Sequence, residues 1–113
     1  MPETPRFLEV DRLIHEPARL AILAVLSSCR SADFVFLHNI TGLSKGNLSV
    51  QISRLEDAGL VFVEKVIEKK KTRTTVSLTK HGTNAVKRYW DTMDKIKKRT
   101  RSELMQRIVS SEV

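Results

Sequence analysis

The sequence predicts a single, mainly α-helical domain that carries one β-hairpin and ends in a long helix. Three observations lead to this fold class. Apolar residues recur at helical spacing through residues 7–58, and a β-branched segment follows at residues 60–78. A charged segment with helical periodicity then fills residues 79–110. The 113 residues suit one compact domain, so we expect a core at 7–78 and a C-terminal helix at 79–110 within one unit, 1–113.

Two helices open the predicted core. The segment FLEVDRLI places apolar residues at positions 7, 10, 13 and 14, which is a helical spacing. Pro17 marks the start of the second helix, because proline is well tolerated in a first turn. This helix, PARLAILAVLSSC, is apolar on nearly every side and should be the most buried. Its last residue, Cys29, is expected to be a small buried hydrophobe rather than a sensor thiol.

Two shorter helices follow, joined by a brief turn. The segment SADFVF can form a short strand or lead straight into the next helix. LHNITGL is typical of a short helix that ends near Gly42, a residue suited to a left-handed turn. Ser44 can then cap a helix over 44–58 by accepting a hydrogen bond from the backbone N–H of Gly46 or Asn47. Gly59 follows as the C′ residue of this helix. The two helices, with the turn between them, form a helix-turn-helix.

The helix over 44–58 has a narrow apolar face. Leu48, Ile52 and Leu55 fall within one third of its circumference and should dock onto the core. Hydrogen-bonding groups of the kind that read base edges and bind phosphates occupy much of the rest. A plain amphipathic helix with a solvated outer face is the alternative. The candidate DNA contacts are Ser44, Lys45, Gly46, Asn47, Ser49, Val50, Gln51, Ser53 and Arg54.

A basic hairpin should follow this helix. We expect antiparallel strands at 60–67 and 73–78, joined by the segment EKKKT at 68–72. Because no Gly or Pro lies there, the tip should be longer than a two-residue turn. The tip carries four cations within five residues, and a nearby polyanion would offset their repulsion. A solvated basic turn is the alternative. The residues of this tip are Lys69, Lys70, Lys71, Thr72 and Arg73.

The predicted C-terminal helix is long for so small a domain. Its apolar stripe cannot be buried entirely on one small core, so we expect the helix to pair with its copy in a second chain. For Tyr89, Trp90 and Met93, the alternatives are a place in the core and the lining of a ligand pocket. The basic cluster Lys95–Arg101 is most simply a solvated face, and its role is left open. The candidate dimer contacts are Tyr89, Trp90, Met93, Ile96, Leu104 and Ile108.

The net charge of +7 is unevenly distributed, with −1 over residues 1–43 and +8 over residues 44–113. This excess favours an anionic partner, nucleic acid first and an acidic membrane surface second. The three histidines lack the paired spacing of a zinc site, and no catalytic arrangement or glycine-rich phosphate loop occurs. We therefore expect no metal, no cofactor and no enzyme. Without an apolar run long enough for a membrane span or a secretion signature, we expect a cytoplasmic protein.

A helix-turn-helix followed by a basic hairpin is the winged-helix arrangement. Three linked motifs resemble the winged-helix regulators of the MarR and ArsR type, over about residues 10–95: HEPARLAILAVL, LSKGNLSVQISRLEDAGLVFVEK and KKKTRTTVSLTKHG. The resemblance implies a homodimeric regulator of transcription that binds double-stranded DNA at specific sites, commonly a repressor. By the same resemblance, helix 44–58 would enter the major groove. The wing at 68–73 would lie on the backbone or in the minor groove.

The sequence departs from the family pattern in three places. The opening has His-Glu-Pro instead of His-Pro, which should shift the helix start slightly. Gln51 stands where the family often has histidine, which would alter base preference. The helix before 44–58 lacks the paired cysteines of metal-sensing members, so metal sensing loses its main support. Two other functions fit the charge and the fold: a sequence-neutral chromatin or RNA-binding protein, and a winged helix that docks other proteins. A small-molecule effector is left open, as are the operator and target genes.

Overall fold

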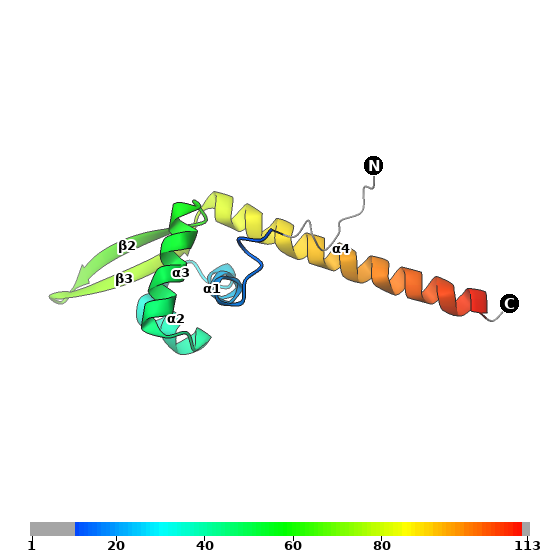
Figure 1. Ribbon diagram of the computed structural model, residues 1–113. Coiled ribbons are helices and arrows are strands. Elements are labelled where there is room, and N and C mark those ends of the chain that lie inside the picture. Colours follow the sequence, from blue (N-terminus) through cyan, green and yellow to red (C-terminus); the bar gives the residue numbers. More distant parts are fainter. Residues whose placement is uncertain (1–10, 112–113) are drawn as a thin grey trace.

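The computed structural model describes residues 11–111 (Figure 1). The predicted fold class is confirmed: the chain is mainly helical, with a β-hairpin wing and a long C-terminal helix. Three antiparallel strands form one sheet in the order β1-β3-β2. The elements are α1 (Pro17–Ser27), β1 (Ala32–Asp33), α2 (Phe34–Thr41), α3 (Lys45–Asp57), β2 (Val61–Glu68), β3 (Lys71–Leu78) and α4 (Lys80–Ser111).

The segment before α1 differs from the predicted helix over residues 7–14. Residues 7–10 lie outside the described part of the chain, and residues 11–14 form a turn instead of a helix. The Asp11 carboxylate accepts a hydrogen bond from the backbone N–H of Leu13 at 2.9 Å. An aspartate that bonds a nearby backbone N–H in this way competes with helix formation. The predicted start of the next helix is confirmed, with Pro17 in its first turn and Glu16 as its N-cap.

Helix α1 supplies the centre of the core. Ile22, Leu23 and Leu26 are almost fully buried, as the apolar pattern predicts, and they belong to one apolar cluster that includes residues of every other element. The prediction that Cys29 is buried is wrong, because this thiol is exposed. The helix ends at Ser27 with Ser28 as its C-cap, so Cys29 lies in the turn beyond the packed face.

The sequence predicts that the segment SADFVF forms a short strand or leads into the next helix, and it does both. The short strand β1 leads directly into α2. Asp33 caps α2 by accepting a hydrogen bond from the N–H of Phe36 at 2.7 Å. Gly42 ends α2 in the left-handed conformation, with φ of 74°. The predicted helix end is therefore confirmed, whereas the helix begins earlier than the segment LHNITGL indicates.

The ends of α3 agree with the prediction. The Ser44 hydroxyl accepts a hydrogen bond from the N–H of Asn47 at 3.1 Å and so caps the first turn. Ala58 is the C-cap, and Gly59 follows with φ of 76°. These two ends place a helix of 13 residues between the turn at residues 42–44 and the hairpin.

The hairpin tip is tighter than the sequence predicts. Glu68 pairs with Lys71, so only Lys69 and Lys70 remain in the turn. Both lysines have positive φ, 48° and 65°. A two-residue turn of this kind matches the twist of its strands, although left-handed backbone costs a non-glycine residue roughly 1–2 kcal/mol. The prediction of a longer tip is therefore wrong: the pairing of β2 with β3 outweighs the local preference for glycine.

Helix α4 divides into a packed half and a projecting half. Thr79 caps it by accepting a hydrogen bond from the N–H of Gly82 at 2.9 Å. Ala85, Val86 and Tyr89 are buried against the body, and Met93 and Ile96 are partly buried there. Beyond them the helix extends away from the body, on the side opposite the wing (Figure 1). The molecule therefore measures 74 × 28 × 22 Å. No helix within residues 11–111 has the length and apolar character needed to cross a membrane.

Candidate nucleic-acid interface

Helix α3 is attached to the core by one narrow face. Leu48, Ile52 and Leu55 are buried, as predicted from their spacing. The other candidate contacts on this helix and at its cap are exposed, with the single exception of Gln51, which is half-buried. Figure 1 shows α3 lying beside the β2–β3 hairpin. Because these side chains are exposed, the helix surface that faces away from the core is open to a partner.

The start of α3 is suited to an anion. Lys45 and Gly46 are both exposed in the first turn. A Cβ at Gly46 would meet no atom within 4 Å, so glycine at this position leaves open space above the backbone. Backbone N–H groups at a helix start carry partial positive charge and commonly hold phosphates. Together with the Lys45 ammonium, this turn has the charge and the space to hold a phosphate group.

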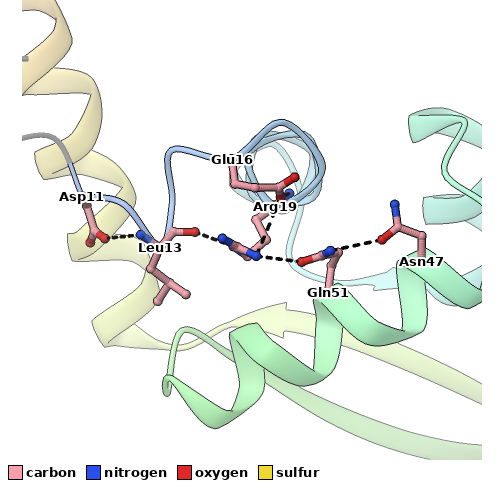
Figure 2. A network of polar contacts seen from close by, with 6 residues as sticks. All are labelled: Asp11, Leu13, Glu16, Arg19, Asn47 and Gln51. Carbon is pink, nitrogen blue, oxygen red and sulfur yellow. Dashed lines mark hydrogen bonds and ion pairs between the residues drawn. The ribbon is translucent and has the colours of Figure 1, made fainter.

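A polar network ties α3 to α1 and is drawn in Figure 2. The Arg19 guanidinium donates from Nη1 to Oε1 of Gln51 at 2.9 Å. Nε2 of Gln51 then donates to Oδ1 of Asn47 at 3.1 Å. Arg19 is absent from the candidates predicted from sequence. The signal that could have indicated it is the presence of a charged residue inside an otherwise apolar helix. Two of the candidate contacts, Asn47 and Gln51, are therefore held in place by a residue of another helix.

Glu16 lies at the edge of this network. Its carboxylate accepts the backbone N–H of Arg19 at 2.8 Å and lies 3.9 Å from the Arg19 guanidinium. The Arg19 backbone hydrogen bond, which outweighs the effect of burial, lowers the pKa of Glu16, and the charges of Arg19 and Arg54 act in the same direction. Arg54, one of the exposed candidate contacts on α3, is thus within electrostatic reach of the α1 cap.

The wing presents its cations at the far end of the hairpin. Lys69, Lys70 and Lys71 are exposed, and the hairpin projects from the body (Figure 1). Arg73 forms an ion pair with Glu68 across the strands, with 3.6 Å between Nη1 and Oε2. An exposed pair of this kind contributes little to stability. The three lysines and Thr72 are exposed at this end of the wing, where a polyanion could reach them.

The candidate dimer contacts on α4 fall into two groups. Tyr89 belongs to the protein's own core, where its hydroxyl lies 2.8 Å from Nδ1 of His15. Met93 and Ile96 also lean on the core, and Trp90, 48% exposed, packs edge-to-face on Tyr89. By contrast, the projecting half exposes a longer apolar surface than the one predicted from sequence: Leu104, Met105, Ile108 and Val109.

A cavity of about 540 Å³ opens beside Trp90. It lies where the end of α1 meets the first half of α4, and Cys29, Arg30 and Lys87 also line it. It is one of several cavities among the described residues with room for a small molecule. In residues 11–111, no group of three or more His, Cys, Asp or Glu side chains is arranged to hold a metal ion.

Comparison with known proteins gives consistent results. The profile of the winged helix DNA-binding domain family matches residues 18–97. An uncharacterised protein of Methanocaldococcus jannaschii is 30% identical over 78 residues, which make up 69% of this chain and 85% of that protein. The matched region ends where α4 leaves the body, so the family likeness covers the packed part of the molecule.

Two solved structures are similar as well. A transcriptional regulator homologue from Pyrococcus horikoshii OT3 has 32% identity and a TM-score of 0.72, over 76% of this chain and 85% of that one. S. aureus MepR, solved as a complex with DNA, has 14% identity and a TM-score of 0.60, over 93% of this chain and 82% of that one. At 14% identity, the second likeness shows a shared fold only.

Proposed function

Because the chain belongs to the winged helix DNA-binding domain family, we propose that it is a sequence-specific transcription regulator that binds double-stranded DNA as a homodimer. The resemblance to winged-helix regulators of the MarR type is confirmed, and this family is non-enzymatic. The observation that carries the proposal is the exposure of α3, which buries three apolar residues and leaves its polar side chains on the surface.

In the mechanism that we propose, α3 enters the major groove. Ser44 and Lys45, at the start of the helix, bind the phosphate backbone. Asn47, Ser49 and Arg54 read base edges, and Val50 contacts a thymine methyl group. Gln51 and Ser53 complete the polar surface. The exposure of all these groups except the half-buried Gln51, and the open space at Gly46, support this arrangement.

The wing grips DNA beside the major groove. Lys69, Lys70, Lys71, Thr72 and Arg73 lie on the backbone or in the minor groove and add affinity rather than sequence choice. Their position at the end of a projecting hairpin supports this role (Figure 1).

The dimer forms through α4. Leu104 is 57% exposed and Ile108 is 47% exposed in a single chain, and a second copy would cover both. A symmetric dimer can place two copies of α3 in successive major grooves, roughly 34 Å apart. Bound at a promoter, such a dimer would exclude RNA polymerase and act as a repressor. The cavity beside Trp90 is where an effector would bind, and its binding there should change the fluorescence of this single tryptophan.

Selection of genomic DNA fragments by the purified protein, at roughly physiological ionic strength, tests the proposal. We expect enrichment of a two-fold symmetric site with half-sites about one helical turn apart. DNA retained without any enriched sequence would instead indicate a sequence-neutral nucleic-acid binder. A protein that retains no DNA under these conditions would be a module that docks other proteins.

A further inference from the structure

The exposed amide of Asn47 is oriented by a chain of hydrogen bonds that begins at Arg19, a residue of another helix. We propose that Arg19 is a positioning residue that makes Asn47 present N–H donors to the major groove, so that Asn47 selects guanine at the base pair it faces. The inference rests on the proposed function, because it names the base that α3 reads at one position.

Arg19 is held on three sides. Its side chain is only 11% exposed. Nε donates to the carbonyl oxygen of Leu13 at 2.5 Å, Nη1 donates to Gln51, and the Glu16 carboxylate lies 3.9 Å away. The turn that carries the Leu13 carbonyl is itself closed by Asp11. The guanidinium is therefore fixed by the segment before α1, by the α1 cap and by α3 (Figure 2).

The polarity of the chain of hydrogen bonds follows from its first member. A guanidinium carries donors and no acceptor, so Gln51 must turn its side-chain oxygen toward Arg19. The nitrogen of the same amide then faces Asn47 and, as a donor, requires the oxygen of Asn47. Figure 2 shows the nitrogen of Asn47 pointing away from Gln51. The charge on Arg19 polarises each bond in turn, which strengthens Asn47 as a donor.

This orientation determines which base suits Asn47. Guanine offers two neighbouring acceptors in the major groove, N7 and O6, whereas adenine offers the acceptor N7 beside the donor N6. An asparagine that is free to turn pairs with adenine through its oxygen and its nitrogen together. Here the oxygen points toward Gln51, and the nitrogen is the atom that points away from it (Figure 2). Turning the Asn47 amide over would leave the nitrogen of Gln51 without its acceptor, which carries a free-energy cost.

Two substitutions break the chain at different points. Arg19→Met keeps most of the side-chain stem but removes all the donors. Gln51→Glu keeps an acceptor for Arg19 yet has no donor for Asn47, so the contact between α1 and α3 survives. The nitrogen of Asn47 would then turn toward the new carboxylate and no longer be presented to the groove. Arg12→Met is the matched control, because Arg12 is exposed, lies outside the network and carries the same charge. If the Arg19→Met variant does not fold, the Gln51→Glu variant still tests whether the network orients Asn47.

Selection from a random DNA library measures base preference at each position, and Asn47→Ala identifies the base pair that Asn47 faces. We expect the wild type and Arg12→Met to prefer guanine over adenine there by about tenfold. Both network variants should reduce that preference to less than about twofold, with other positions unchanged.

Other outcomes separate this inference from the proposed function. An unchanged guanine preference in Gln51→Glu, or equal weakening on every sequence, would overturn the positioning role of Arg19. A preference for adenine at the Asn47 position would also overturn it while leaving the regulator intact. If the wild type enriched no sequence at all, the proposed function itself would fail.

Discussion

At the scale of single residues, the exposed groups of α3 differ in how firmly they are held. Gln51 is fixed by Arg19 before any DNA arrives, and so the cost of ordering it is met during folding. Arg54 is exposed on the same helix and has the length to reach a base edge or a phosphate. The surface of α3 therefore combines a side chain that is already held in place, Gln51, with exposed side chains such as Arg54 that can adjust to the DNA.

Arg54→Ala tests direct base reading. If the Arg54 guanidinium makes two hydrogen bonds to one guanine, we expect the discrimination at that base pair to fall by about 1–3 kcal/mol. Competition binding with single-base variants of the selected site measures this loss. An equal loss on every sequence would show instead that Arg54 contacts a phosphate.

The α1 cap gives a prediction about pH. The pKa of Glu16 is lowered below its ordinary value of 4.5 in the folded chain, first by the backbone N–H of Arg19. Its contribution to stability is therefore present above that pH and is lost as the pH falls through the folded pKa. We expect Glu16→Gln to lower the free energy of unfolding by about 0.5–1 kcal/mol at pH 7.

Urea unfolding at a series of pH values provides the measurement. The difference between the wild type and Glu16→Gln should shrink once the pH falls below 4.5 and continue to shrink in stronger acid. A difference that stayed constant down to the acid limit of folding would mean that the charge of Glu16 has no part in the cap.

At the scale of elements, the wing combines strain with charge. Its turn holds Lys69 and Lys70 in the left-handed region, where glycine or asparagine is more usual. The strands that close this turn are paired through their whole length, from Val61 with Leu78 to Glu68 with Lys71. The strand pairing therefore stabilises a tip with lysines at two positions where glycine or asparagine would adopt the backbone conformation at a lower free-energy cost.

Replacing Lys69, Lys70 and Lys71 together by alanine should flatten the salt dependence of DNA binding. The slope of log K against log salt should fall by up to about 0.9 for each phosphate that the wing no longer neutralises. Binding measured across a salt series tests this expectation. The matched control replaces Lys95, Lys97 and Lys98 on α4, which removes the same charge from another element. A slope unchanged by the wing substitutions would place the wing outside the interface.

At the scale of the whole molecule, the projecting half of α4 carries apolar surface that a single chain does not bury. It exposes apolar residues on a helix that has left the body (Figure 1). Contiguous exposed apolar surface commonly marks a site of association. The proposed dimer would bury this surface and set the distance between the two copies of α3, so that association and site recognition depend on the same helix.

Leu104→Glu combined with Ile108→Glu tests the dimer. Because the two carboxylates would have to be buried in the interface, we expect a monomer at micromolar concentration and a large loss of affinity for the symmetric site. Sedimentation measures the oligomeric state. Asn84→Glu with Arg88→Gln, one turn apart on the packed half of α4, changes the charge by the same amount outside the projecting apolar surface and should remain a dimer. A wild-type chain that sedimented as a stable monomer would contradict the proposal.

Local sequence signals were sufficient for much of this fold. The turn between α2 and α3, the two ends of α3 and its buried face follow from Gly42, Ser44, Gly59 and the spacing of Leu48, Ile52 and Leu55. Each of these features depends on interactions within about four residues along the chain, so a cap or a periodic pattern is enough to predict it. The exposed polar face of α3, and hence most of the candidate interface, could be predicted for the same reason.

Other features were decided only by tertiary structure. The tight tip at Lys69 and Lys70 depends on the pairing of two complete strands, and the exposure of Cys29 depends on where α1 stops packing. The hydrogen bond from Arg19 to Gln51 joins residues 32 positions apart, and no local pattern links them. The sequence by itself thus determined which residues face outward. The folded chain decided which of them are held in a fixed orientation, because that depends on contacts between elements distant in sequence.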